Sequence, residues 1–160
     1  MQDWMKQYFL VVFPLFFAGM WLFSMYWMAL ASGWRLLAKR FRAQGEFPGQ
    51  KWKMQSAHMR WLTGFNGCLT VGADKAGLFM VPFVLFRIWH PALFIPWTEI
   101  TAREKTVFLF FNMIELRLGR SEELPFTINK DLAAKVQAAA GSSWPSGYDK
   151  AMESAPPPIA

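Results

Sequence analysis

The feature that most constrains this chain is a long uncharged apolar run near its N-terminus. Residues 8 to 31, YFLVVFPLFFAGMWLFSMYWMALA, contain no Asp, Glu, Lys, Arg or His. As a helix rising about 1.5 Å per residue, the run would reach roughly 36 Å, enough to cross a hydrocarbon core with some tilt. A cleaved signal peptide is the alternative, but its apolar region is usually shorter. The sequence therefore predicts a transmembrane anchor over residues 1 to 33.

The charges on the two sides of the run differ and predict its orientation. Asp3 and Lys6 precede it, whereas a group of basic residues follows it closely. These basic residues are Arg35, Lys39, Arg40 and Arg42. Because cytoplasmic flanks carry the excess of Lys and Arg, we expect a single-pass protein with its N-terminus outside and the rest of the chain in the cytoplasm.

The basic charge is concentrated directly after the anchor, in residues 34 to 59. The segment WRLLAKRFRAQ spaces its apolar side chains at helical intervals, with most basic residues on other faces. One interpretation is a helix lying on an anionic lipid surface, and the other is a plain stop-transfer flank followed by a linker. In the first interpretation the lipid contacts are Trp34, Arg35, Lys39, Arg40, Phe41 and Arg42. Basic groups held this close to lipid phosphates make nucleic acid an improbable partner.

A second apolar stretch, residues 76 to 97, also needs an assignment. It reads AGLFMVPFVLFRIWHPALFIPW and contains Arg87, His90 and three prolines. A second membrane span would bury a charge and interrupt the helix at each proline, so short strands are favoured over a span. In ALFIPWTEI we expect Phe94 and Trp97 to pack inward, Pro96 to lie at a strand edge, and the following polar residues to face water.

The remaining pattern indicates a β domain over residues 60 to 141. Two apolar runs around GADKAG predict one hairpin, and the alternation in MIELRLGRSEELPFTI predicts another. In total we expect five to seven strands. NKDLAAKVQAAAG then predicts a helix capped by Asn129 and ended by Gly141. Residues 142 to 160, rich in Pro, Ser and Ala, are expected to be a disordered tail. The fold class is thus a membrane-anchored α+β chain: one transmembrane helix, then a small antiparallel β domain closed by a C-terminal helix.

Part of this domain resembles a known family. The elements LTVGADKAGLFM, LFRIWHPALFIPWTEI and IELRLG, followed by a terminal helix, resemble bacterial pleckstrin-homology-like or GRAM-like domains over about residues 62 to 140. The resemblance implies a membrane-proximal binding or scaffolding module without catalysis, in the bacterial inner membrane. The loop around Asp74 and Lys75 is charge-balanced and lacks the basic cluster with which some relatives hold inositol phosphates.

No catalytic or metal-binding pattern emerges. His58 and His90 stand outside any metal-ligand spacing, and Cys68 lies in an apolar strand where a core role is favoured over a reactive one. We therefore expect no enzyme activity, no metal, no cofactor and no small-molecule substrate.

The anchor itself offers a surface for a partner. Its large side chains suit packing on another integral membrane protein, and Gly19 would admit close approach, although contact with lipid alone is an equal alternative. The candidate contacts are Phe17, Gly19, Met20, Trp21 and Trp27. The expected function is that of an accessory or adapter subunit of a membrane protein complex. The alternative is a protein that binds lipid head groups or a hydrophobic ligand at the membrane surface.

Overall fold

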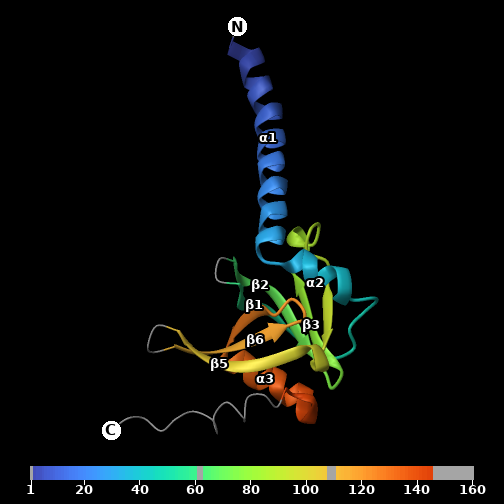
Figure 1. The fold of residues 1–160 in the computed structure, drawn as a ribbon. Helices are drawn as coiled ribbons and strands as arrows, with labels where there is room; N and C mark the ends of the chain where they lie inside the picture. The colour runs from blue at the N-terminus through green and yellow to red at the C-terminus, as the bar shows by residue number, and fades with distance from the viewer. Residues whose placement is uncertain (1, 61–62, 108–110, 146–160) are drawn as a thin grey trace, which may run out of the picture.

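The computed structural model describes residues 2–60, 63–107 and 111–145 of the chain. Helix α1 (Gln2–Ala31) projects away from a β domain formed by the rest of these residues, as Figure 1 shows. None of the residues in its most apolar stretch is fully buried, and within the described residues it is the one helix long and apolar enough to cross a membrane. The predicted apolar helix is therefore present.

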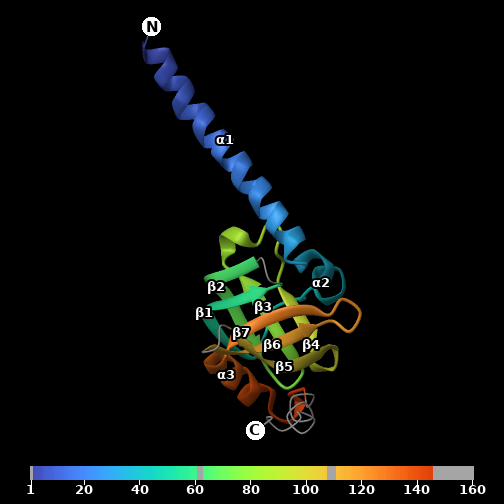
Figure 2. The same ribbon diagram turned by 60° about the vertical axis from the view of Figure 1, so that its left-hand side comes forward.

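Seven antiparallel strands form one strongly curved, nearly barrel-like sheet (Figures 1 and 2). The strands follow the order β4-β3-β2-β1-β7-β6-β5. The two outermost strands are consecutive in the chain and are joined by the short 3-10 helix η2 (Trp97–Glu99). Their bounds are β1 (Gln50–Met59), β2 (Thr63–Ala73), β3 (Gly77–Pro82), β4 (Leu93–Pro96), β5 (Ile100–Val107), β6 (Phe111–Leu118) and β7 (Leu124–Asn129).

Both predicted hairpins are present. Strands β2 and β3 pair through Ala73 and Leu78 around the Asp74 turn, where the Asp74 carboxylate accepts hydrogen bonds from the backbone N–H groups of Ala76 and Gly77. Strands β6 and β7 pair down to Leu118 and Leu124. Their alternation places Ile114, Leu116, Leu118, Leu124, Phe126 and Ile128 in the core.

The domain begins earlier in the chain than residue 60. Strand β1 occupies the stretch expected to be a linker, and it pairs with both β2 and β7 at the centre of the sheet. Helix α2 (Trp34–Phe41) also adds buried side chains to the core. Alternation is poor in β1, whose register shifts between Trp52 and Gln55 and again before Ala57, so the strand signal was hidden in the sequence.

The C-terminal helix α3 (Lys130–Ala140) has the predicted ends. The side chain of Asn129 accepts a hydrogen bond of 2.8 Å from the backbone N–H of Leu132. Gly141 follows with a φ of +58°, which favours glycine. Figure 1 shows α3 at the end of the sheet opposite α1. A short turn, η3 (Gly141–Ser143), follows, and most of the expected disordered tail lies outside the described residues.

The stretch from residue 76 to 97 is not a second membrane-spanning helix. Its two ends form β3 and β4, which pair with each other from Gly77–Pro96 to Met80–Leu93. Between them lies a connection that contains the short 3-10 helix η1 (Val84–Phe86). The strand interpretation is therefore confirmed.

The side-chain directions in ALFIPWTEI are only partly as expected. Trp97 is buried, its Nε1 donates to the carbonyl of Asp74, and Pro96 lies on the edge strand β4. Phe94, however, does not enter the main core, because Leu93 and Ile95 on either side of it point there. Phe94 is half-buried on the outer face, against Phe47. The prediction that Phe94 packs inward was wrong, because the inward-facing positions of this strand are Leu93 and Ile95.

Candidate functional site

The junction between α1 and α2 is buried in the β domain. Ser32 and Trp34 are fully buried, and Gly33 between them has a φ of +77°. A Cβ on Gly33 would lie 2.8 Å from a methyl group of Leu124, so a larger residue would be strained by the positive φ and would displace the Leu124 side chain. The guanidinium of Arg60 donates to the carbonyl of Ala31 at the C-terminus of α1, at 3.2 Å. These contacts hold α1 in a defined direction relative to the sheet.

The apolar face of α2 packs on the domain. Trp34 is 0% exposed, its Nε1 donates to the carbonyl of Pro91, and Phe41 is 9% exposed. The expectation that these two aromatic side chains contact lipid is therefore corrected. Helical spacing indicates that one face of a helix is apolar, but it does not distinguish a lipid surface from a protein core.

The basic residues of α2 divide into two groups. Arg40 points to the β6–β7 turn, where its guanidinium lies 3.2 Å from the Ser121 hydroxyl and 3.4 Å from the Glu122 carboxylate. Arg35 points back to α1, with its guanidinium carbon 5.3 Å from the centre of the Tyr26 ring. Arg40 is thus engaged within the domain, and it does not line the cavity that Arg35, Lys39 and Arg42 share.

An exposed apolar loop, residues 83–89, lies at the same end of the domain as α1 (Figures 1 and 2). Leu85 is 56% exposed and Ile88 is 65% exposed, although both are large apolar residues. Phe83, Val84 and Trp89 are exposed as well. Contiguous apolar surface of this kind marks an interaction site. We refer to this segment as the apolar loop.

The apolar loop was not predicted from the sequence as a functional element. The segment FVLFRIW was assigned to a region of short strands, because its apolar residues were expected to be buried in the core. Two features of the sequence could have indicated an exposed connection here: the apolar segment lies between Pro82 and Pro91, and it contains Arg87. A connection between strands is normally polar.

The apolar loop packs against α1 through two pairs of aromatic rings, one stacked and one edge-to-face. Ring centres lie 6.1 Å apart for Trp21 and Phe86, and 5.4 Å apart for Tyr26 and Trp89. Trp21 precedes the end of α1 at Ala31 by ten residues, which is roughly 15 Å along the helix axis. The loop therefore extends alongside the apolar run of α1 and does not stop at its end.

A row of aromatic side chains continues this contact along α1, and we call it the aromatic ladder. Its members follow one another at intervals of four residues, with ring centres 5.2 to 6.4 Å apart. They are Phe9, Phe13, Phe17 and Trp21, with Phe86 of the apolar loop as the next ring. Helix α1 and the β domain thus share one continuous aromatic surface.

The residues of α1 that were predicted to contact a partner do not all share this surface. Phe17 and Trp21 belong to the aromatic ladder, and the exposed Met20 lies one turn from Phe17. Gly19 lies between ladder positions and points to another side of the helix, where a Cβ would meet nothing within 4 Å. Trp27 is exposed and stacks edge-on with Phe23 instead.

A basic cleft opens between α2 and the apolar loop, with a volume of about 400 Å³. Four of its residues are cationic, and no acidic residue lines it. The lining is Arg35, Ala38, Lys39, Arg42, Arg87, Ile88, Trp89 and Pro91. We call it the basic cleft.

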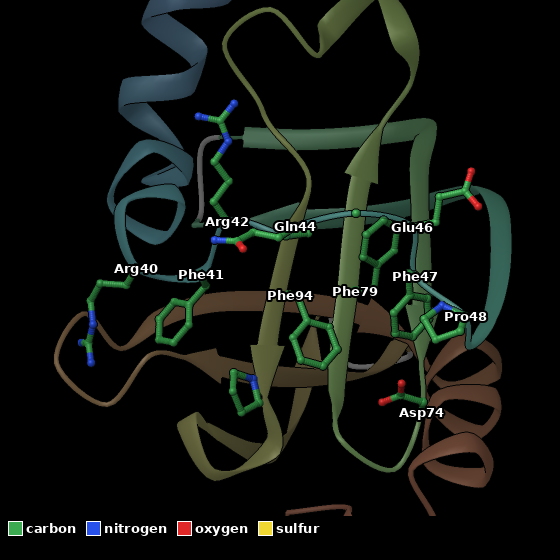
Figure 3. A pocket seen from close by; sticks show the side chains of 13 residues that line it. Arg40, Phe41, Arg42, Gln44, Glu46, Phe47, Pro48, Asp74, Phe79 and Phe94 are labelled. Carbon is green, nitrogen blue, oxygen red and sulfur yellow. The ribbon is translucent and has the colours of Figure 1, made fainter.

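A second cavity, of about 540 Å³, lies on the outer face of β3 and β4 and is shown in Figure 3. Its floor is aromatic: Phe47 stacks on Phe79, with ring centres 4.8 Å apart, and Phe94 lies beside them. Its rim carries two arginines and two acidic residues, so the cavity selects neither an anionic nor a cationic ligand. The carboxylate of Asp74 is already engaged in the β2–β3 turn.

The side chains of His90 and Cys68 have shifted pKa values. Burial lowers the pKa of His90, with a partial offset from the Phe86 carbonyl, 3.2 Å from its Nδ1. Burial likewise raises the pKa of the Cys68 thiol, and nearby backbone hydrogen bonds oppose the shift. Burial therefore favours the neutral imidazole of His90 and the protonated thiol of Cys68, and a protonated thiol is a weak nucleophile.

The part of the chain that the structure describes holds no group of three or more His, Cys, Asp and Glu side chains suited to a metal ion. His90 stacks edge-on with Trp34 and Phe65, at 5.5 and 5.9 Å. This histidine is therefore a component of the apolar core. The features that stand out chemically are the apolar loop, the aromatic ladder and the basic cleft, all at the end of the domain nearest α1.

A functional assignment has to be based on these features, because no similar protein suggests a function. Comparisons with protein-family models, curated proteins and solved structures found no match for this chain.

Proposed function

We propose that this chain is a non-catalytic, single-span membrane protein that serves as an accessory or adapter subunit of a membrane protein complex. Helix α1 crosses a bacterial inner membrane with its N-terminus outside, and the β domain lies at the cytoplasmic face. The observation that carries the proposal is the aromatic ladder, which runs along the anchor and continues into the domain at Phe86.

The ladder suits a protein partner inside the bilayer. Phe9, Phe13 and Phe17 are each about half exposed or more, yet their rings are ordered by mutual stacking. Aromatic side chains have few rotatable bonds, so little conformational entropy is lost when a partner packs against them. An integral membrane protein with a complementary groove is the partner that this surface fits.

The buried junction supports the adapter role. Since Ser32 and Trp34 are buried and Arg60 bonds to the end of α1, the domain has a fixed orientation on its anchor. The apolar loop, packed on α1, holds the same end of the domain against the membrane. A module fixed in this way presents α3 and the β2–β3 turn to the cytoplasm in one orientation (Figure 1).

The fold is compatible with a pleckstrin-homology-like domain. Seven antiparallel strands followed by a helix at one end are what the resemblance of LTVGADKAGLFM and IPWTEI implies. We include this family, and its role as a scaffold, in the proposal.

Site-specific photo-crosslinking in native membranes tests the proposal. A photoreactive phenylalanine at Phe17, within the ladder, is expected to give a discrete protein adduct after illumination. The matched control is Phe23, which is 63% exposed but lies outside the ladder, and it should give little adduct. Adducts with lipid alone at both positions would contradict an accessory subunit.

A further inference from the structure

We propose that the basic cleft binds the phosphate head group of an anionic phospholipid from the leaflet that borders the β domain. This inference rests on the proposed placement of the domain at the membrane, and it adds a specific ligand class and its site. Nothing in the adapter role requires such a ligand.

The charge of the cleft selects an anion. Arg35 and Lys39 come from α2, Arg42 directly follows it, and Arg87 comes from the apolar loop, so two separate segments converge on one space. No acidic side chain lines that space. Four cations around about 400 Å³ repel one another, and an anion that enters between them relieves this repulsion.

These cations are free of carboxylate partners within the described part of the chain. Arg40, one residue from Lys39, forms a 3.4 Å ion pair with Glu122 outside the cleft. No ion pair of 4.0 Å or less engages Arg35, Lys39, Arg42 or Arg87 among those same residues. The Nε of Arg87 donates to the carbonyl of Pro82 at 3.3 Å, which orients its guanidinium and leaves its other N–H groups available.

The cleft lies at the level expected of lipid head groups. Arg35 lies over the Tyr26 ring at 5.3 Å, and Trp89 contacts the same ring at 5.4 Å. Tyr26 is five residues from the end of α1, roughly 7.5 Å along its axis, where tyrosine and tryptophan mark a membrane interface. An anionic group at this depth belongs to the bilayer surface.

One wall of the cleft favours a lipid over a water-soluble phosphate. Ile88 and Trp89 border the cations directly, and Ile88 belongs to the exposed apolar loop. Cations beside exposed apolar surface match a phosphate joined to acyl chains. A soluble phosphate ester would leave this apolar wall in water.

Native mass spectrometry of the full-length chain in non-ionic detergent tests the inference. The probes are phosphatidylglycerol, phosphatidylcholine with the same acyl chains, and free glycerol phosphate. We expect phosphatidylglycerol adducts at an affinity at least about tenfold above that of phosphatidylcholine, and no retained glycerol phosphate. The double variant Arg42→Gln/Arg87→Gln should weaken phosphatidylglycerol binding about 30-fold, as expected for the loss of two cations near a lipid surface.

The matched control is Lys53→Gln/Lys135→Gln, which removes the same charge from exposed positions elsewhere in the domain and should keep wild-type affinity. The charge-preserving variant Arg42→Lys/Arg87→Lys should retain most of the binding, which separates loss of charge from loss of fold. Equal losses in the cleft and control variants, no preference for phosphatidylglycerol, or equal binding of glycerol phosphate would each overturn the inference. The lipid-binding measurement needs no protein partner. Loss of lipid binding with a successful crosslink at Phe17 would therefore overturn this inference alone, and lipid binding without a crosslink would overturn the adapter role alone.

Discussion

The indole Nε1 of Trp34 donates a hydrogen bond of 2.8 Å to the carbonyl of Pro91, fifty-seven residues further along the chain. This bond joins the first residue of α2 to the end of the connection that carries the apolar loop. The elements that surround the basic cleft are thereby held together by a fully buried side chain. The position of α1 and that of the apolar loop are therefore structurally linked.

Replacement of Trp34 tests this link. We expect Trp34→Ala to lower the free energy of unfolding of the β domain by about 3 to 5 kcal/mol, because it leaves a cavity and an unpaired Pro91 carbonyl. Chemical denaturation of the full chain in detergent measures the loss. The control Leu36→Ala removes a side chain that is 47% exposed on the same helix, and it should change stability by less than about 0.5 kcal/mol. Similar effects of both substitutions would mean that α2 does not pack on the domain.

His90 should make stability depend on pH. Its folded-state pKa lies below that of the unfolded chain, so folding favours the neutral ring. Its contribution is then complete above about pH 6.5, the ordinary histidine value, and is lost as the pH falls from there toward the folded-state pKa. Melting curves between pH 7.5 and pH 5 measure this.

The variant His90→Phe retains an aromatic ring between Trp34 and Phe65 and removes the titrating group. It is expected to be less stable at pH 7.5 and to lose less stability than the wild type on acidification. An unchanged pH dependence in the variant would assign the effect to another group.

The apolar loop should enter the hydrocarbon layer. In a Cys68→Ser background, a fluorescent probe attached at Leu85→Cys is expected to shift to shorter wavelength in vesicles and to be quenched by spin labels on lipid acyl chains. The same probe at Lys135→Cys on α3, at the opposite end of the domain, should show neither effect (Figure 1). Quenching at neither position would place the loop in water.

Neighbouring residues of β4 should differ in their contributions to stability. Ile95→Ala is expected to cost about 2 to 5 kcal/mol because Ile95 is fully buried. Phe94→Ala should cost less, since Phe94 is half-buried in the smaller cluster with Phe47 and Phe79. Unfolding curves of the two variants in detergent give the comparison, and the reverse order would mean that the strand faces the other way.

The orientation of the chain is open to a direct test. Reporter fusions after residue 45 and after residue 140 are both expected to read cytoplasmic, because the basic residues follow α1. Two readings on the outer side would mean that α1 inserts in the opposite sense. Replacing Arg35, Lys39 and Arg42 by Gln in one variant should weaken the preference for this orientation.

Local patterns in the sequence determined several elements of the fold. The uncharged run from residue 8 to 31, the alternation around Leu116 and Phe126, and the cap at Asn129 each predicted the element that the structure contains. Each of these signals depends on a few neighbouring residues and on the period of a helix or strand, so no knowledge of distant contacts was needed.

Tertiary structure decided which apolar faces are buried and which remain free. Helical spacing showed that Trp34 and Phe41 share a face, but the sheet that covers this face is formed by residues far along the chain. The same limit hid the apolar loop, whose residues are as apolar as those of β3 but find no strand to cover them. The basic cleft also exists only because Arg87 is brought next to Arg42 when β3 and β4 pair. Burial depends on contacts between distant segments, and a one-dimensional pattern carries the period of an element but not the identity of what packs against it.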